Sequence, residues 1–266
     1  MQQAYGLPIP TTVINEMVGV PVQDRHRFHG FIELLIDGIA TYGIEAAGEK
    51  MDGFVDYVRG LIAIRRADPG DDILSGLIHA NEDGDTLSED EIVAMVYILV
   101  TAGYETTYNL IANGVATLLT HPDQLDLLKA QPTLIDSAVE EILRYTGTVG
   151  STEPTTYAAE DMTLHDVTIP RGAMVLALLA SANRDPAEFT DPHTFDITRD
   201  PNRHLAFSRG NHFCLGASLA RMETKIAIAN LIQRFPNLHL AVEPGELSLV
   251  PMPLMNRLDG LPVVLG

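Results

Sequence analysis

One cysteine, Cys214, stands in this sequence of 266 residues, in the stretch FSRGNHFCLG between Gly210 and Gly216. A helical apolar pattern starts directly after it. Cys214 therefore falls at a predicted helix start, where unpaired N–H groups and the helix dipole favour a thiolate. The flanking glycines let the backbone approach a flat ligand closely. A thiolate held in this way is a good ligand for a soft or borderline metal.

Two interpretations of Cys214 follow from its residue type. A lone cysteine in a globular protein is most often a small buried hydrophobic side chain. The alternative is a metal ligand, and the lack of partner cysteines excludes a structural zinc or an iron–sulfur cluster. Haem iron requires only one strong axial ligand from the protein, which a single cysteine can supply.

An acid and an alcohol, Glu105 and Thr106, stand side by side in the stretch AGYETT. Ala102 and Gly103 precede them, and a glycine inside a helix costs about 1 kcal/mol relative to alanine. A tight helix crossing or a solvated polar face would explain these residues without chemistry. Small residues also let a flat ligand lie against the helix, and an acid beside an alcohol could relay a proton.

A third pattern, EEILR, places Glu141 and Arg144 one helical turn apart. An exposed pair at this spacing contributes only about 0.2–0.5 kcal/mol to a helix. The spacing alone therefore does not separate a surface ion pair from a buried structural one.

Periodicity predicts the elements that position these residues. We expect helices over 12–38 and 45–67, a central helix over about 88–121 that starts with a Ser88–Glu91 capping box, a helix starting near Pro132 and running through LIDSAVEEILRY, and a helix after the cysteine. Short strands are expected around a Pro170–Gly172 turn and over 238–265. The predicted fold is mainly α with small β-sheets, in a single domain over residues 1–266.

Composition excludes several classes of protein. The 36 acidic and 17 basic residues give a net charge of -19, which opposes binding to nucleic acid and to anionic membranes. The apolar runs are shorter than the ~18–20 residues of a membrane span, and the N-terminus lacks a secretory signal. Without a second cysteine no intramolecular disulfide is possible, so we expect a cytoplasmic protein.

The stretch FSRGNHFCLG resembles the haem-binding signature of the cytochrome P-450 family, with Phe207, Gly210, His212, Cys214 and Gly216 at the motif positions. AGYETT is similar to the family's oxygen-activating stretch, EEILR holds its Glu-x-x-Arg pair, and PHTFDITRDPNRHLAFS looks like the meander before the haem loop. The chain resembles the C-terminal two-thirds of a soluble bacterial member.

The resemblance implies haem b with Cys214 as the iron ligand, and Glu105 and Thr106 as catalytic residues. It implies that Ala102 and Gly103 lie against the haem, that Arg199 completes a buried structural set with Glu141 and Arg144, and that His204 and His212 hydrogen-bond the haem propionates. It also implies a partly hydrophobic substrate pocket lined by Ile98, Val149, Thr152, Met252 and Leu254.

The sequence departs from the family at Thr156, where a propionate-binding arginine is usual, and in having no counterpart of the family's first third. We expect that this leaves apolar surface on the central helix and on the helix after the cysteine. The chain would then associate with itself or a partner chain, or would bind haem loosely.

Two functions stay open. The first is a monooxygenase that inserts one oxygen atom into a small hydrophobic organic substrate with electrons from a ferredoxin and ferredoxin reductase. A net charge of +3 over residues 199–225, in a chain of -19, favours an acidic electron donor. The alternative is a catalytically impaired homologue that acts as a protein partner or subunit of a biosynthetic enzyme. A peroxide-driven variant is disfavoured because Glu105 and Thr106 are both kept.

Overall fold

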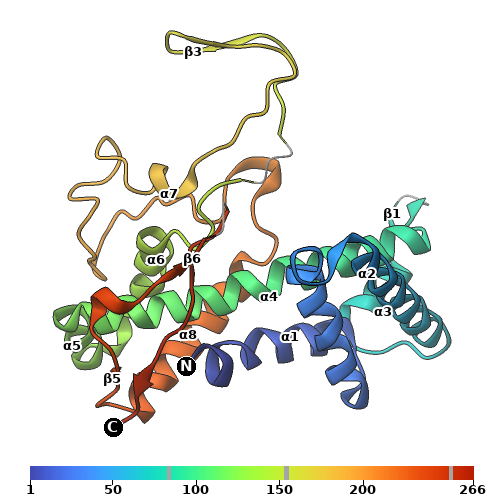
Figure 1. Cartoon of the computed structure of the whole chain (residues 1–266), viewed down its shortest axis with the longest axis horizontal. Coiled ribbons are helices and arrows are strands. Elements are labelled where there is room, and N and C mark those ends of the chain that lie inside the picture. Colours follow the sequence, from blue (N-terminus) through green and yellow to red (C-terminus); the bar gives the residue numbers. More distant parts are fainter. Residues whose placement is uncertain (83–84, 153–155, 252–253) are drawn as a thin grey trace. The chain divides into compact units, whose positions relative to one another are not determined.

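The computed structural model describes residues 1–82, 85–152, 156–251 and 254–266 (Figure 1). Its helices are α1 (Pro8–Val18), α2 (Arg25–Ala67), α3 (Ile73–His79), α4 (Glu89–Thr120), α5 (Pro122–Ala130), α6 (Ile135–Thr146), α7 (Leu179–Ala182) and α8 (Ala217–Arg234). The strands form antiparallel pairs: β1 (Asn81–Glu82) with β2 (Asp85–Thr86), β3 (Met162–Leu164) with β4 (Val167–Ile169), β5 (His239–Leu240) with β8 (Val263–Val264), and β6 (Leu249–Val250) with β7 (Arg257–Leu258). The predicted fold class is confirmed.

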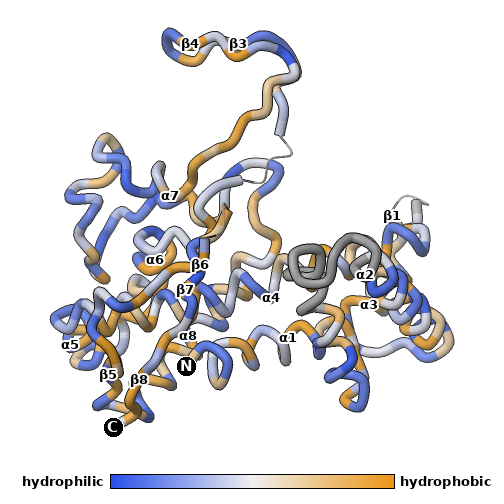
Figure 2. The backbone as a smooth tube through the Cα atoms, in the orientation of Figure 1, coloured by the Kyte–Doolittle hydropathy of each residue, from blue (hydrophilic) through white to orange (hydrophobic). Residues whose placement is uncertain are grey.

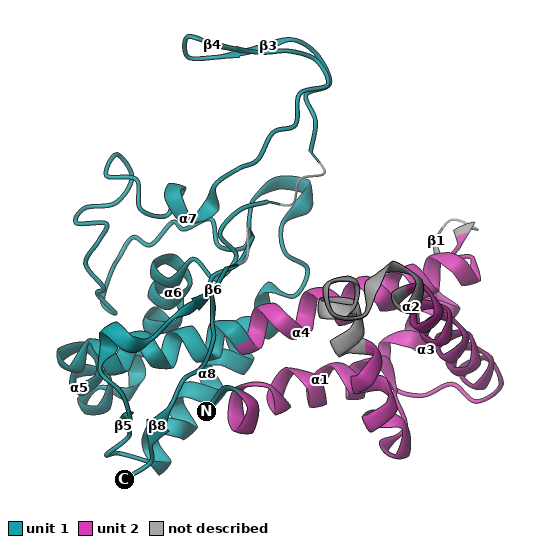
Figure 3. Ribbon diagram, viewed as in Figure 1, with its two compact units in different colours: residues 1–2, 109–266 teal, residues 3–108 magenta. Residues whose placement is uncertain are grey.

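The chain divides into two compact units (Figure 3). One comprises residues 3–108, and the other comprises residues 1–2 and 109–266. Helix α4 contributes its first part to one unit and its second part to the other. None of the helices in the described residues is long and apolar enough to span a bilayer.

Helix α4 begins with the predicted capping box. The Ser88 N–H and hydroxyl both donate to Glu91 Oε2 at 2.8 Å, and the Glu91 N–H donates back to Ser88 Oγ at 3.3 Å. Hydrogen bonds from Ser88 lower the pKa of the Glu91 carboxyl. Helix α5 was not predicted: its first residue is Pro122, and a proline at the first helical position starts a helix as readily as it ends one.

An aromatic cluster forms the centre of the 3–108 unit. Phe28 and Phe54 of α2 are fully buried, and their ring centroids lie 6.1 Å apart. Leu74 of α3 and Val100 of α4 are fully buried in the same core. The first part of α4 is thus packed on one face against α2 and α3.

The prediction of one helix over residues 12–38 is wrong, because the chain breaks between Gly19 and Arg25. Gly19 adopts φ +79° and ends α1, and Pro21 follows, so the chain turns before α2 begins at Arg25. Glycine reaches this left-handed conformation without a Cβ clash, which makes it a helix terminator. Conversely, the break predicted between residues 38 and 45 does not occur, because α2 is continuous from Arg25 to Ala67.

Three helices meet closely in the 109–266 unit. A Cβ added to Gly114 of α4 would lie 3.0 Å from Ile142 of α6 and 3.1 Å from Ile228 of α8. Both isoleucines are fully buried. The small residue at position 114 therefore allows α4 to lie close to α6, which carries the Glu-x-x-Arg pair, and to α8, which follows the cysteine.

The strand predictions are confirmed in part. Strands appear within 238–265, but the first hairpin turns at His165, whose φ is 50°, and not at Pro170–Gly172. Gly172 forms the next turn, in which the Ala173 N–H donates to the Pro170 carbonyl. The apolar stretch 173–178, orange in Figure 2, leads from this turn into α7.

Candidate functional site

The loop before α8 presents Cys214 at the surface of its unit. A single 3-10 turn over Gly210–His212 starts at Gly210, with φ +79°, and the Cys214 N–H donates to the Phe207 carbonyl at 3.0 Å. Helix α8 then begins at Ala217, and the Cys214 carbonyl accepts from its N–H at 3.3 Å. The predicted position of the cysteine at a helix start is confirmed, and its thiol is exposed rather than buried.

The residues of this loop fit a haem bound through sulfur. Apart from the immediate chain neighbours, no residue lies within 4 Å of where a Cβ would stand on Gly210 or Gly216, so both glycines border open space in the cysteine loop. Phe213 and Leu215, on either side of Cys214, are 53% and 82% exposed. An exposed thiol set among exposed apolar side chains is unusual on a soluble surface, and it suits a flat, largely apolar ligand.

The side chains of Glu140, His204, Phe207 and Arg221 form a cluster that we call the support cluster. The Arg221 guanidinium of α8 donates to both carboxylate oxygens of Glu140 on α6, at 2.6 and 2.9 Å, and stacks over the Phe207 ring. His204 Nε2 lies 3.1 Å from Glu140 Oε2. Although burial opposes it, hydrogen bonding from His204 and Arg221 lowers the pKa of Glu140 to about 2. Glu140 and Arg221 were not predicted as site residues, although the doubled glutamate of EEILR is a signal for Glu140.

Glu141, Arg144 and Arg199 do come together. Arg144 is fully buried and donates to the Glu141 carboxylate at 2.7 and 2.8 Å, and Arg199 Nε donates to the same carboxylate at 3.2 Å. The remaining Arg144 donors reach the carbonyls of Asn183, Pro192 and Thr194. This bidentate, fully hydrogen-bonded pair therefore ties α6 to the segment that leads to the cysteine loop.

The acid–alcohol pair lies in the other unit, on α4. Glu105 is 6% exposed, and the Thr106 hydroxyl donates to the Ala102 carbonyl at 2.6 Å. A Cβ on Gly103 would lie 2.8 Å from Ile14 Cδ1 of α1. Gly103 is therefore needed for a close helix contact in this unit, which is the structural interpretation of that glycine.

The two histidines expected to bind the haem propionates, His204 and His212, differ in their hydrogen bonding. His212 is exposed and available to an acidic ligand group. In contrast, both ring nitrogens of His204 are engaged, one with Glu140 and the other with the Ala206 N–H at 3.2 Å. Thr156 is exposed. The structure thus commits His204 to the support cluster.

Three of the five residues predicted to line a substrate pocket lie close together in the structure. The Gly150 N–H donates to the Leu254 carbonyl, Val149 forms a bridge with Met255, and the Thr152 hydroxyl accepts from the Ala177 N–H. Val149, Thr152 and Leu254 thus lie on neighbouring segments of one unit. Ile98 belongs to the other unit and is 55% exposed, and Met252 lies outside the described residues.

The expected positive surface beside the cysteine is reduced by ion pairing. Arg199, Arg221 and Lys225 bind acids of α6, with Lys225 Nζ 2.6 Å from Asp136. Counting charges along the segment missed these partners because they lie far away in sequence. In the part of the chain that the structure describes, Arg203 and Arg209 form no ion pair and are exposed.

A mainly helical fold with an exposed cysteine before α8 and a buried Glu-x-x-Arg pair is the arrangement expected from the resemblance to the haem-thiolate class of proteins. The Cytochrome P450 family model matches residues 47–246. The chain is 45% identical to the cytochrome P450 monooxygenase PikC of Streptomyces venezuelae and 45% identical to a vitamin D(3) 25-hydroxylase of Pseudonocardia autotrophica. These matches cover 99% and 100% of this chain, but only 62% and 65% of those relatives.

A solved structure of a cytochrome P450 has the same fold over nearly all of this chain. Cytochrome P450 PksS of Bacillus subtilis 168 superposes with a TM-score of 0.94 at 41% identity, over 99% of this chain and 68% of that one. The chain therefore belongs to the cytochrome P450 family. It spans about two thirds of the length of the relatives it matches.

Proposed function

We propose that this protein is a haem-thiolate monooxygenase in which the Cys214 thiolate is the axial ligand of haem b. The observation that carries the proposal is the exposed thiol, flanked by open glycines and exposed apolar side chains at the start of α8. When bound, the haem supplies dioxygen activation and insertion of one oxygen atom into an organic substrate.

Glu105 and Thr106 would move protons in this reaction. Glu105 is a buried acid, and Thr106 carries a hydroxyl that the helix already orients through the Ala102 carbonyl. Because the Thr106 proton is used in that bond, its oxygen is left to accept a hydrogen bond from a reacting group. The proton that the reaction consumes would come from the carboxyl group of Glu105, while Thr106 would hold the reacting group through the hydrogen bond that it accepts.

Haem retention would rest on few cationic groups. We assign a propionate to His212, because its imidazole is exposed in the cysteine loop, and not to His204, whose ring is bound to Glu140. Thr156 supplies no charge. Apolar contact with Phe213 and Leu215 would therefore provide much of the binding free energy.

A lipophilic substrate fits the pocket residues. Val149 and Leu254 are apolar and half-buried, while Thr152 adds one hydroxyl to orient a polar group. The relative named as a vitamin D(3) 25-hydroxylase is consistent with a lipophilic substrate. Pockets of this kind combine an apolar lining with a few polar anchors.

We assign electron supply to a ferredoxin with its reductase. Arg203 and Arg209 are the exposed charges that would attract an acidic donor to the cysteine side. Arg199, Arg221 and Lys225 are already paired with acids of α6. The attraction between the remaining arginines and the ferredoxin should therefore be weak and strongly sensitive to salt.

The test is turnover under labelled dioxygen. The haem-loaded protein is given reduced ferredoxin, NADPH-driven reductase and a panel of lipophilic substrates under ¹⁸O₂, and products are analysed by mass spectrometry. A product carrying one ¹⁸O atom supports the proposal. Haem-loaded protein that accepts electrons yet yields no labelled product from any substrate would contradict it.

A further inference from the structure

Asn113 of α4 is a buried polar side chain that joins two distant segments of the 109–266 unit. It is 7% exposed, and its Nδ2 donates to the Asn256 carbonyl at 2.7 Å and to Thr148 Oγ1 at 3.2 Å. Thr148 is buried as well, and its hydroxyl shares a hydrogen bond with the Thr146 hydroxyl at 3.1 Å. Because both hydrogens of the Asn113 amide are used, the side chain holds the two segments in one arrangement.

Asn256 binds the end of α6 in the same network. Its Nδ2 donates to the carbonyls of Thr146 and Gly147, at 3.1 and 2.8 Å, and its backbone N–H donates to the Thr148 carbonyl at 2.9 Å. The last carbonyls of a helix lack partners within the helix, so this amide caps α6. Gly147 has φ +54°, and a Cβ there would lie 2.8 Å from Ala180 Cβ. A larger residue would therefore displace the capped turn.

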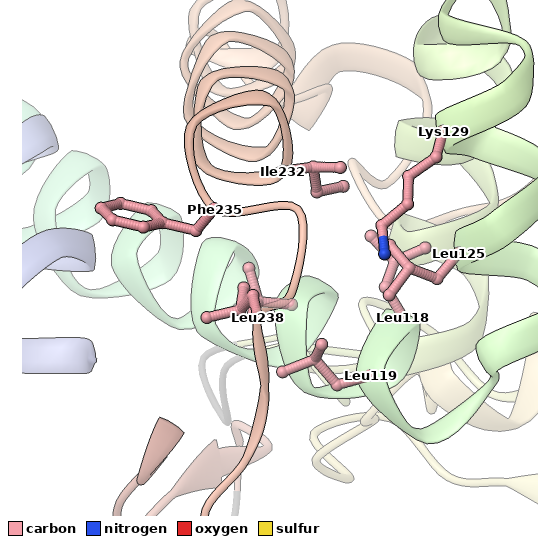
Figure 4. Close-up of a pocket in the computed structure, with 8 residues that line it drawn as sticks. Leu118, Leu119, Leu125, Lys129, Ile232, Phe235 and Leu238 are labelled. Carbon is pink, nitrogen blue, oxygen red and sulfur yellow. The ribbon is translucent and has the colours of Figure 1, made fainter. Parts of the chain in front are cut away.

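The part of α4 that carries Asn113 is closely packed. A Cβ on the next residue, Gly114, would lie 3.0 Å from Ile142 of α6. Further along the helix, Leu118 lines a small apolar pocket together with Ile232 of α8 (Figure 4). Because well-packed helices resist displacement, α4 is a fixed support from which Asn113 reaches the two segments.

These segments carry residues predicted to line a substrate pocket. Val149 follows Thr148 directly, and the Gly150 N–H donates to the Leu254 carbonyl at 2.8 Å. Backbone hydrogen bonding thus holds the Val149 segment against the Leu254 segment, and Asn113 ties both to α4. A shift at Asn113 would therefore move the two apolar side chains relative to the rest of the unit.

We propose that Asn113 and Asn256 are positioning residues that set substrate specificity, a role that rests on the proposed function. Neither side chain needs to touch substrate, because the amide hydrogens of both are bound within the protein. They act through Val149 and Leu254, whose fixed arrangement decides which lipophilic chains fit. Removing the Asn113 amide leaves the Asn256 carbonyl and the Thr148 hydroxyl without this donor, so the segments must move or admit water.

Hydrogen exchange of the full chain, followed by mass spectrometry, tests the positioning without haem. The wild type is compared with Asn113→Ala, Asn256→Ala and the control Gln124→Ala. Gln124 lies in the same unit and accepts a backbone N–H at 3.0 Å, outside the predicted pocket segments. In both Asn variants, exchange over residues 147–150 and 254–256 should become about three- to tenfold faster, the range that one buried hydrogen bond spans. Gln124→Ala should leave it unchanged.

Binding tests the specificity. Haem-loaded wild type, Asn113→Ala, Asn256→Ala and Gln124→Ala are titrated calorimetrically with decanoic, dodecanoic and hexadecanoic acid. Both Asn variants should bind the acid that the wild type prefers about three- to tenfold more weakly, with smaller changes for the other acids, so that the preference narrows. Gln124→Ala should keep the wild-type preference.

Three outcomes would overturn the proposal. Exchange over the two segments stays unchanged in both Asn variants, or exchange becomes faster while the preference among the acids stays that of the wild type, or the wild type binds none of the three acids. A narrowed preference in a protein that yields no labelled product under ¹⁸O₂ would instead contradict the proposed function and leave the positioning role supported.

Discussion

Arg221 of α8 lies over the ring of Phe207, its guanidinium carbon 4.5 Å from the ring centroid, while its Nε donates to Glu140 at 2.6 Å. Phe207 in turn accepts the Cys214 N–H through its carbonyl. One side chain thus joins α6, α8 and the loop that presents the thiol. Hydrogen bonding to the Glu140 carboxylate raises the pKa of Arg221, although burial opposes it. The guanidinium therefore stays charged.

Replacing Arg221 with Leu should make the protein more sensitive to acid. The pKa of Glu140 is about 2 in the folded chain, below its ordinary value of 4.5, so its stabilising contribution is present above pH 4.5 and is lost as pH falls toward 2. That contribution is at most about 3 kcal/mol, since each pKa unit is worth about 1.4 kcal/mol and partial exposure weakens the pairing.

Circular dichroism during acid titration measures this effect. Unfolding should begin at higher pH in Arg221→Leu than in the wild type, whereas Lys225→Leu, which removes an exposed pair with Asp136, serves as control. Identical acid midpoints for Arg221→Leu and the wild type would show that Glu140 does not depend on Arg221.

Glu141→Ala should damage folding more than any surface change. It leaves Arg144, which is fully buried, without its carboxylate, and breaking a buried pair in this way costs about 3–5 kcal/mol. Asp136→Ala removes an exposed partner and should cost less than about 1 kcal/mol. Soluble yield and denaturant unfolding compare the two, and equal stability for both variants would contradict a structural role for the buried set.

Thr106→Ala should uncouple electron consumption from product formation. Removing the hydroxyl beside Glu105 interrupts proton handling, so peroxide should be released and product per electron should fall several-fold. Thr101→Ala is the matched control, because Thr101 makes the same kind of helix hydrogen bond, to the Tyr97 carbonyl at 2.9 Å. Unchanged product yield per electron in Thr106→Ala would remove this residue from the mechanism.

The exposed apolar face of α8 should promote association. Met222 and Ile226 are 52% and 53% exposed one turn apart, beyond the highly exposed Leu215. Light scattering at several concentrations should show self-association that Met222→Ser with Ile226→Ser reduces. Ile64→Ser, at an equally exposed position of α2, should have little effect. A wild-type chain that stays monomeric throughout would refute the expectation.

The sequence predicts an element correctly where its start depends only on neighbouring residues. The Ser88–Glu91 cap starts α4, and the segment after Cys214 is helical, because both depend on neighbouring residues. The exit from α1 was missed because a left-handed Gly19 followed by Pro21 looks like any interruption of an apolar pattern.

Partners distant in sequence could not be read from any one segment. The Glu140–Arg221 contact joins positions 81 residues apart, and pairing with α6 neutralises charges that looked like a positive surface when counted along the chain. Resemblance, rather than periodicity, grouped Glu141, Arg144 and Arg199, and the structure shows their hydrogen bonds.

The most direct test of the account is the absorption spectrum of haem-loaded protein, reduced and exposed to carbon monoxide, for the wild type and Cys214→Ser. A thiolate is a far stronger electron donor to haem iron than a hydroxyl, so the wild type should show the thiolate-type carbon monoxide spectrum and Cys214→Ser should not. An unchanged spectrum in Cys214→Ser, or wild-type protein that binds haem without a thiolate signature, would contradict the central claim.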